Sequence, residues 1–138
     1  MSPEELAAIQ EAASVAGLRH IYGDEPFPRL AVLGRWREST DTIFAEDGAG
    51  FAAIAPPWLN GLYVRPEAWG TGVAGRLHDR AVEALRAGGV EPARLWVLAD
   101  NLRARRFYEK RGWYLDGETR VVPFPPHPLD VGYSLDLG

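Results

Sequence analysis

Three closely spaced glycines, Gly70, Gly72 and Gly75, follow a short apolar stretch and open a segment that has the apolar spacing of a helix. Glycine lets the backbone of a turn approach a ligand closely, and the first amides of a helix have no partner within the helix. These amides, reinforced by the helix dipole, attract phosphate. The residue types and their spacing therefore predict a site for a phosphate-bearing cofactor.

The same glycines satisfy GxGxxG, the pattern of dinucleotide-binding folds, but the surrounding sequence disfavours that interpretation. Residues 65–69 separate Gly70 from the preceding strand, whereas the pattern places its first glycine at the strand end. The acidic residue expected about 20 residues further on is matched only by Glu91, which precedes the next strand instead of ending it. We therefore expect a cofactor with a single nucleotide.

A second group of residues follows the next strand, where Asn101 precedes Ala104, Phe107 and Tyr108. Asn101 offers an amide donor and an acceptor at the strand end, Ala104 leaves space, and the two aromatic residues follow one helical turn later. Two parallel strands that each end in such a turn splay apart to form a cleft, which is where open α/β sheets bind ligands.

Capping, breaker and periodicity signals predict the elements that position these two turns. Ser2 is expected to cap a first helix from Pro3 to Gly17, and a second helix is expected over 29–38, with Leu30, Leu33 and Trp36 or Arg37 at helical spacing. The further predictions are an antiparallel hairpin of 42–46 and 51–55, strand 58–64, a helix from Val73 to Gly88, strand 93–98, a helix from Asn101 to Gly112, and strands 113–119 and 131–137.

Length and composition limit the number of domains and the kinds of partner and site that we expect. The 138 residues, 46% of them hydrophobic, suit one domain spanning 1–138, with a mixed α/β sheet and a central parallel pair of strands. The net charge of −4 argues against nucleic acid as a partner, and the absence of cysteine excludes disulfides and thiolate chemistry. The three histidines lack metal-ligand spacing, so we expect no metal site and ordinary surface or packing roles for them. No stretch is long and apolar enough for a membrane span, so we expect a cytoplasmic protein.

The two motifs together resemble the paired signatures of the GNAT superfamily, the general-control-related N-acetyltransferases that use acetyl-CoA. The loop signature (Arg/Gln)xxGx(Gly/Ala) is matched by residues 69–74, WGTGVA, and the signature NxxAxxFYxxxGF is matched from Asn101 to Trp113. The resemblance implies a GNAT fold whose central parallel pair splays around the cofactor. It also implies transfer of an acetyl group from acetyl-CoA (coenzyme A) to a primary amine of a small molecule or peptide.

The resemblance also implies roles for individual residues. The strand end 62–64 would lend backbone groups to the pantetheine arm, the amides of 70–75 would hold the pyrophosphate, and Tyr108 would protonate the departing thiolate. The implied cofactor-binding residues are Leu62, Tyr63, Val64, Trp69, Gly70, Thr71, Gly72, Val73, Ala74, Gly75, Asn101, Ala104, Phe107 and Tyr108. Candidates for the adenosine phosphates are Arg76, Arg103, Arg105 and Arg106.

The sequence departs from the family pattern in two places. Trp69 stands where the loop signature has Arg or Gln, which removes a charge but leaves the backbone amides. The first strand of the family is apparently missing, so the hairpin strand 42–46 would form an open edge that invites a second subunit, giving a homodimer.

The sequence leaves the acceptor side of the reaction open. Strand 58–64 contains no carboxylate, so the general base could be Glu46, Asp47, Glu67 or a water chain. Tyr22 and Trp36 are candidates for the wall of an acceptor pocket. The missing strand carboxylate also leaves an alternative function, that of a non-catalytic acyl-CoA-binding or regulatory domain.

Overall fold

The computed structural model describes residues 1–138. Its elements in chain order are α1 (Pro3–Gly17), α2 (Arg19–Tyr22), α3 (Arg29–Glu38), β1 (Thr42–Glu46), β2 (Gly50–Ala55), β3 (Trp58–Val64), the 3-10 turn η1 (Pro66–Ala68), α4 (Val73–Ala87), β4 (Ala93–Leu98), α5 (Leu102–Glu109), β5 (Tyr114–Val121) and β6 (Leu129–Leu135). The predicted helices and strands are confirmed, with small shifts at the ends of β5 and β6. Local signals explain this agreement: the Ser2 hydroxyl, for example, accepts a hydrogen bond from the Glu5 amide and caps α1.

The strands form one mixed sheet of six strands in the order β1-β2-β3-β4-β6-β5. Only β3 and β4 run parallel, and all other neighbours are antiparallel. The mixed α/β sheet with one central parallel pair is therefore confirmed, as is the position of β1 at the edge. The final hairpin places β6 rather than β5 against β4, an order that the sequence did not predict.

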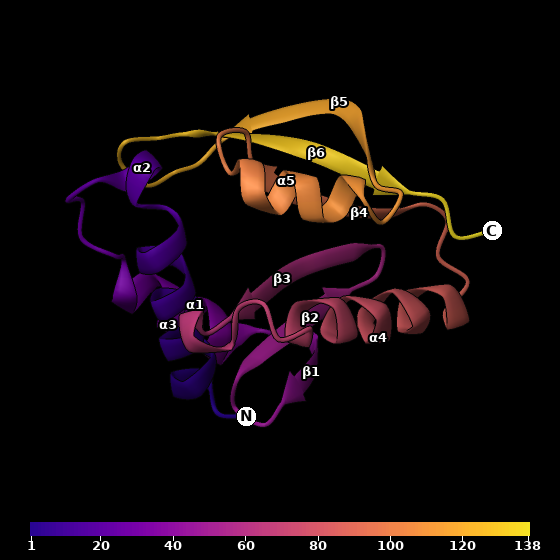
Figure 1. The fold of residues 1–138 in the computed structure, drawn as a ribbon, viewed down its shortest axis with the longest axis horizontal. Coiled ribbons are helices and arrows are strands. Elements are labelled where there is room, and N and C mark those ends of the chain that lie inside the picture. The colour runs from indigo at the N-terminus through magenta and orange to yellow at the C-terminus, as the bar shows by residue number, and fades with distance from the viewer.

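The parallel pair diverges along its length. β3 and β4 pair only at Trp58 and Arg94, where the Arg94 amide also donates to the Pro57 carbonyl at 2.9 Å. Figure 1 shows the outcome: β3 lies with β1 and β2 in one half of the sheet, while β4, β6 and β5 form the other half. The splayed pair that the resemblance implies is confirmed, and the carboxyl ends of both strands open towards α4 and α5.

Helices cover the two faces of the first half of the sheet. Successive side chains of β2 alternate between the faces, so Ala52 packs in the cluster under α4 while Phe51 packs with α1 and α3. The predicted apolar positions of α3 are confirmed at Trp36, which is buried, and wrong at Leu30, which is 85% exposed, because Val32 is buried instead. Leu30 and Val32 both lie at helical spacing from Trp36 or Leu33. Docking of the helix on the sheet, which the local sequence does not specify, buries Val32 and leaves Leu30 exposed. None of the helices combines the length and the apolar character needed to cross a bilayer.

Candidate functional site

The glycine-rich turn connects β3 to α4 and leaves a row of amides unpaired. Gly70 and Gly72 have φ angles of 78° and 87°, in the left-handed region that side chains rarely adopt. The first hydrogen bond of the helix runs from the Arg76 amide to the Gly72 carbonyl at 3.1 Å. The amides of residues 70–75 donate to no acceptor within the protein. This donor set, at the N-terminus of a helix of 15 residues, suits a phosphate group.

The end of β3 supplies an open backbone edge beside this turn. Because β4 pairs with β3 only at Trp58, residues 62–64 have no strand on that side. The Val64 carbonyl accepts a hydrogen bond from Nε1 of Trp69 at 2.8 Å, which ties the turn to the strand end. An extended ligand that carries amides can pair with such an edge as an added strand.

Helix α5 places its predicted site residues on the other wall of the cleft. Asn101 caps the helix, with its Oδ1 accepting from the Ala104 amide at 3.2 Å, whereas the sequence left the cap open between Asn101 and Asp100. Ala104 and Phe107 are half-buried, and Tyr108 is 9% exposed, with its ring 5.3 Å from that of Phe107. The two predicted motifs therefore lie on the two elements that follow the diverging strands.

The Tyr108 hydroxyl forms no hydrogen bond with the protein and is therefore free to bond a ligand in the cleft. Burial raises its pKa well above the usual range, the neighbouring Tyr63 raises it further, and Arg111 opposes both effects. The phenol therefore stays protonated at neutral pH. Its ring belongs to an aromatic cluster with Phe107, His78 and Trp113.

His78 supports this cluster from α4. It is 4% exposed, and its Nε2 accepts a hydrogen bond from Nε1 of Trp113 at 3.0 Å, while its Nδ1 lies 2.9 Å from the Asp79 carboxylate. Burial lowers the pKa of His78, and Asp79 partly offsets this effect. The packing role expected for a histidine is thus confirmed here. The hydrogen bond to Trp113 was not predicted, because the two residues are far apart in the sequence.

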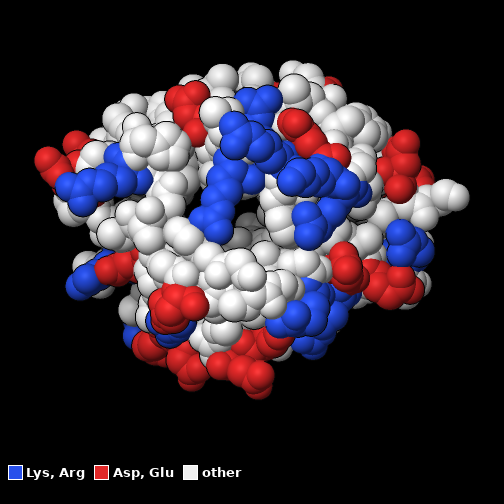
Figure 2. Space-filling model, viewed as in Figure 1, with Lys and Arg blue, Asp and Glu red and all other residues white.

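Of the four candidate arginines, Arg106 is exposed, and the other three differ in their surroundings. Arg76 pairs with Glu46 at 2.6 Å, and Arg105 points inward to the Tyr133 hydroxyl at 2.9 Å and to the Ala99 carbonyl at 2.8 Å. Arg103 makes no ion pair or hydrogen bond and lies over the ring of Trp69. Figure 2 shows Lys and Arg side chains gathered around a hollow on this face of the molecule.

One arginine that sequence reasoning missed, Arg111, also reaches the turn. Its guanidinium carbon lies 3.7 Å from the centroid of the Phe107 ring. One of its terminal nitrogens is 3.1 Å from the point where a Cβ on Gly75 would stand, so a glycine there makes room for it. The only available signal was a basic residue next to the Gly112 that ends the α5 motif.

The acidic residues near the site are only partly those considered from the sequence. Glu46 is engaged with Arg76, whose hydrogen bonds and charge hold the pKa of Glu46 below its usual range. Asp130, which sequence reasoning missed, is buried on β6 and accepts from Arg120 at 3.0 Å. Burial raises the pKa of Tyr22 and Tyr63, and the nearby charge of Asp130 raises both further. Asp130 was missed because the last strand was expected to begin only at 131.

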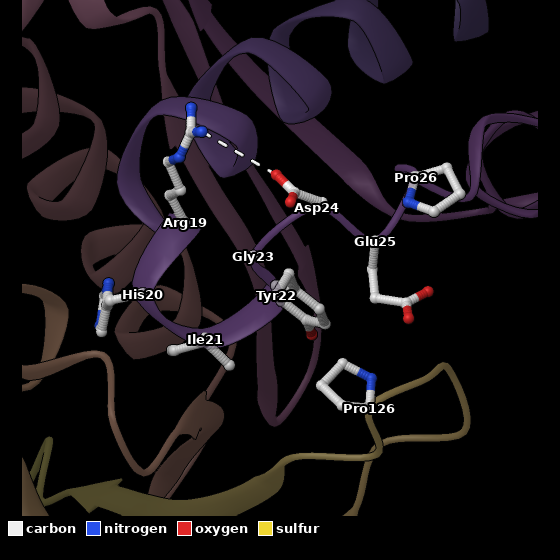
Figure 3. Close-up of a pocket in the computed structure, with 9 residues that line it drawn as sticks. All are labelled: Arg19, His20, Ile21, Tyr22, Gly23, Asp24, Glu25, Pro26 and Pro126. Carbon is white, nitrogen blue, oxygen red and sulfur yellow. Dashed lines mark ion pairs between the residues drawn. The ribbon is translucent and has the colours of Figure 1, made fainter.

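An open groove of about 460 Å³ lies beside α2. Figure 3 shows that Tyr22 and the loop with Asp24 and Glu25 line it from one side, and Pro126 of the β5–β6 loop from the other. Tyr22 thus lines a surface depression. Trp36, the other residue considered for an acceptor pocket, is instead buried against Phe51 and donates to Gln10 at 2.8 Å.

Comparisons with known proteins bear on this arrangement. The model of the acetyltransferase (GNAT) family matches residues 7–113. A mycothiol acetyltransferase from Beutenbergia cavernae is 40% identical over an alignment that covers 49% of this chain and 26% of the relative, so the match spans about a quarter of that protein.

Two solved structures share the fold. A GCN5-related N-acetyltransferase from Rhodopseudomonas palustris superposes with a TM-score of 0.72 at 21% identity, covering 99% of this chain and 88% of that one. An N-acetyltransferase from Thermoplasma acidophilum in complex with coenzyme A gives a TM-score of 0.65 at 20% identity, covering 95% and 91% of the two chains.

Proposed function

Because the chain belongs to the acetyltransferase (GNAT) family, we propose that residues 1–138 form one acetyl-CoA-dependent N-acetyltransferase domain, which acetylates a primary amine of a small molecule or peptide. The observation that carries the proposal is that the unpaired amides of residues 70–75 and the free hydroxyl of Tyr108 lie on the two elements that flank one cleft. The first group suits a phosphate and the second a leaving group that needs a proton.

The chain has a fitting partner for each part of acetyl-CoA. The amides of 70–75 are donors for the pyrophosphate, and the open edge of β3 at 62–64 suits the amides of the pantetheine arm. Ala104 and Phe107 on α5 offer an apolar wall, and the amide nitrogen of Asn101 remains available because only its oxygen caps the helix. Bound acetyl-CoA would supply an activated acetyl group as a thioester.

Tyr108 is the group that handles the proton on the leaving side. Acetyl transfer forms a carbon–nitrogen bond, breaks the carbon–sulfur bond and leaves a thiolate that needs a proton. The Tyr108 phenol is protonated at neutral pH, and its hydroxyl has no partner in the protein, so it can donate its proton to the thiolate at its oxygen. The pKa raised by burial favours recovery of that proton after each turnover, not the donation itself. A backbone amide of 62–64 is the candidate donor to the carbonyl oxygen of the acetyl thioester, where negative charge develops during the reaction.

The amine must also lose a proton, and several groups could accept it. A free alkylamine has a pKa near ~10, so it is protonated at pH 7. Glu46 is the weakest of the candidates because its carboxylate is paired with Arg76. Asp47 in the β1–β2 turn, Glu67 in η1 and a water chain remain as candidates.

Two further parts of the proposal concern the oligomeric state of the protein and its location in the cell. We propose a homodimer that pairs through the open edge of β1, where no further strand lies beyond the sheet. A cytoplasmic location stays a prediction of the sequence. Light scattering at micromolar protein concentration distinguishes a monomer from a dimer.

A second candidate function is a non-catalytic acyl-CoA-binding domain. The observation that favours it is the absence of a carboxylate from β3, the strand that lines the cleft. This alternative keeps the phosphate site and predicts cofactor binding without turnover.

Thiol release from acetyl-CoA, measured over a panel of amines, separates the two functions. We expect turnover on at least one amine, and a loss of about 100-fold to 10,000-fold in kcat for Tyr108→Phe, because the proton donor is removed while the ring stays. Tyr114→Phe is the matched control, since Tyr114 is exposed on β5 and bonds Asp136. Tight binding of acetyl-CoA without turnover on any amine would exclude the enzyme, and equal rates in wild type and Tyr108→Phe would exclude the acid role of Tyr108.

A further inference from the structure

Trp69 occupies the loop position where the family signature has Arg or Gln, and its side chain contacts three parts of the structure. Its Nε1 donates to the Val64 carbonyl at 2.8 Å. The far edge of its ring lies 3.6 Å from the point where a Cβ on Gly17 would stand, at the end of α1. The guanidinium carbon of Arg103 lies 3.9 Å from the centroid of its ring. The indole is thus fixed on one side of the cleft and stacked against a cation from the other.

Arg103 comes from the first turn of α5 and keeps its donors free. It takes part in no ion pair and no hydrogen bond, unlike Arg76 and Arg105. A guanidinium that stacks by its face on an aromatic ring still presents its N–H groups around the rim, in the fork geometry that matches phosphate. Trp69 directly precedes the unpaired amides that begin at Gly70.

We propose that Trp69 is a positioning residue that holds Arg103 beside the amides of residues 70–75, where the guanidinium binds the pyrophosphate of acetyl-CoA. The charge missing at position 69 is supplied across the cleft by α5. This inference rests on the proposed function, because it takes coenzyme A as the ligand. It adds a side-chain contact to a site that otherwise consists of backbone amides.

Calorimetric titration of the whole chain with coenzyme A tests the contact. Arg103→Gln should weaken binding about 10-fold to 100-fold, the range for losing hydrogen bonds to a charged group. Trp69→Leu should weaken it about 5-fold, since the arginine remains but is no longer held, as for a stacked cation of about 1 kcal/mol. The double variant should bind no more weakly than Arg103→Gln alone, because Trp69 acts through Arg103.

Matched variants separate this role from a general effect on folding or charge. Arg94→Gln also removes one positive charge, from an arginine on β4 whose guanidinium carbon lies 5.9 Å from the centroid of the Trp58 ring. This control variant should bind coenzyme A like the wild type. Trp69→Phe keeps a ring for stacking and should bind more tightly than Trp69→Leu. The Tm of each variant without ligand shows whether the fold is intact, and kcat should stay unchanged while KM for acetyl-CoA rises.

Dephospho-coenzyme A, which lacks the 3′-phosphate, identifies the phosphate that Arg103 binds. The loss caused by Arg103→Gln should be equally large with this ligand. If the loss disappears, Arg103 binds the 3′-phosphate and the pyrophosphate assignment is wrong. If Arg103→Gln binds like the wild type, or if the two single losses multiply in the double variant, the role of the stack is refuted while the proposed function stands. If the wild type binds no coenzyme A, both fail.

Discussion

The buried His78 makes a specific prediction about stability and pH. In the folded protein its Nε2 accepts from Trp113 at 3.0 Å, and burial lowers its pKa from the ordinary 6.5. The unfolded chain therefore binds a proton at His78 at a pH where the folded protein does not. The free energy of unfolding has its full contribution from His78 above pH 6.5 and loses it as the pH falls towards the lower, folded-state pKa.

The size of this effect follows from proton linkage. Between the two pKa values the loss approaches about 1.4 kcal/mol for each pH unit, so about 1.4 kcal/mol is its upper limit at pH 5.5, one unit below the ordinary pKa of histidine. Protonation of Nε2 would also remove the acceptor of the Trp113 N–H and leave two donors facing each other. For a domain of this size, 1 kcal/mol corresponds to a change in Tm of about 4 °C.

Urea unfolding of the wild type and of His78→Gln at pH 7.5 and 5.5 measures the effect. Glutamine can accept from Trp113 through Oε1 but does not titrate. The wild type should lose more stability than the variant between the two pH values, by an amount that cannot exceed about 1.4 kcal/mol. Carboxylates such as Glu46, whose pKa is lowered from 4.5, lose their contribution to stability only as the pH falls further, and they act equally in both proteins. An equal loss in both proteins would refute the assignment to His78.

Two further pairs of substitutions test local features of the fold. Asn101→Ala should lower the free energy of unfolding by about 1 kcal/mol, because the Ala104 amide loses its cap, whereas Asn101→Asp should keep the cap; urea unfolding measures both. Gly50→Ala should destabilise by about 1–3 kcal/mol, since its Cβ would stand 2.6 Å from the Tyr63 carbonyl oxygen, while Gly34→Ala meets no atom within 4 Å and should be neutral or stabilising in the same assay. Equal stability of the two alanine variants of glycine would contradict the packing argument.

The elements could be predicted because their ends depend on neighbouring residues. The Ser2 side chain caps α1 by accepting from the amide of Glu5, three residues on, and the Asn101 side chain caps α5 by accepting from the amide of Ala104. The place of β6 between β4 and β5 depends instead on pairing between segments distant in sequence, for which no local residue is a signal. The prediction that Leu30 lies on the buried face of α3 failed for the same reason, since Leu30 and Val32 are equally compatible with a helix.

The candidate site likewise has parts that the local sequence predicts and parts that depend on the fold. The amides of 70–75 and the position of Tyr108 follow from motifs that are continuous in sequence. The stack of Arg103 on Trp69, the reach of Arg111 to Gly75 and the buried Asp130 each join segments that only the fold brings together. Composition could suggest that arginines bind phosphate, but only packing distinguishes a free guanidinium from one already paired.

Helix α4 links the two ends of the proposed cofactor site. Its first residues supply the unpaired amides that begin the helix, and His78, on its second turn, supports the cluster that holds Tyr108. At a rise of 1.5 Å per residue, His78 lies about 8 Å along the axis from Val73. The helix therefore fixes the spacing between the phosphate turn and the acid, and a change that shifts α4 should alter cofactor affinity and turnover together. A change confined to the stack of Arg103 on Trp69 should alter cofactor affinity alone. Comparing the change in affinity with the change in turnover therefore shows whether a variant has moved α4 or only this stack.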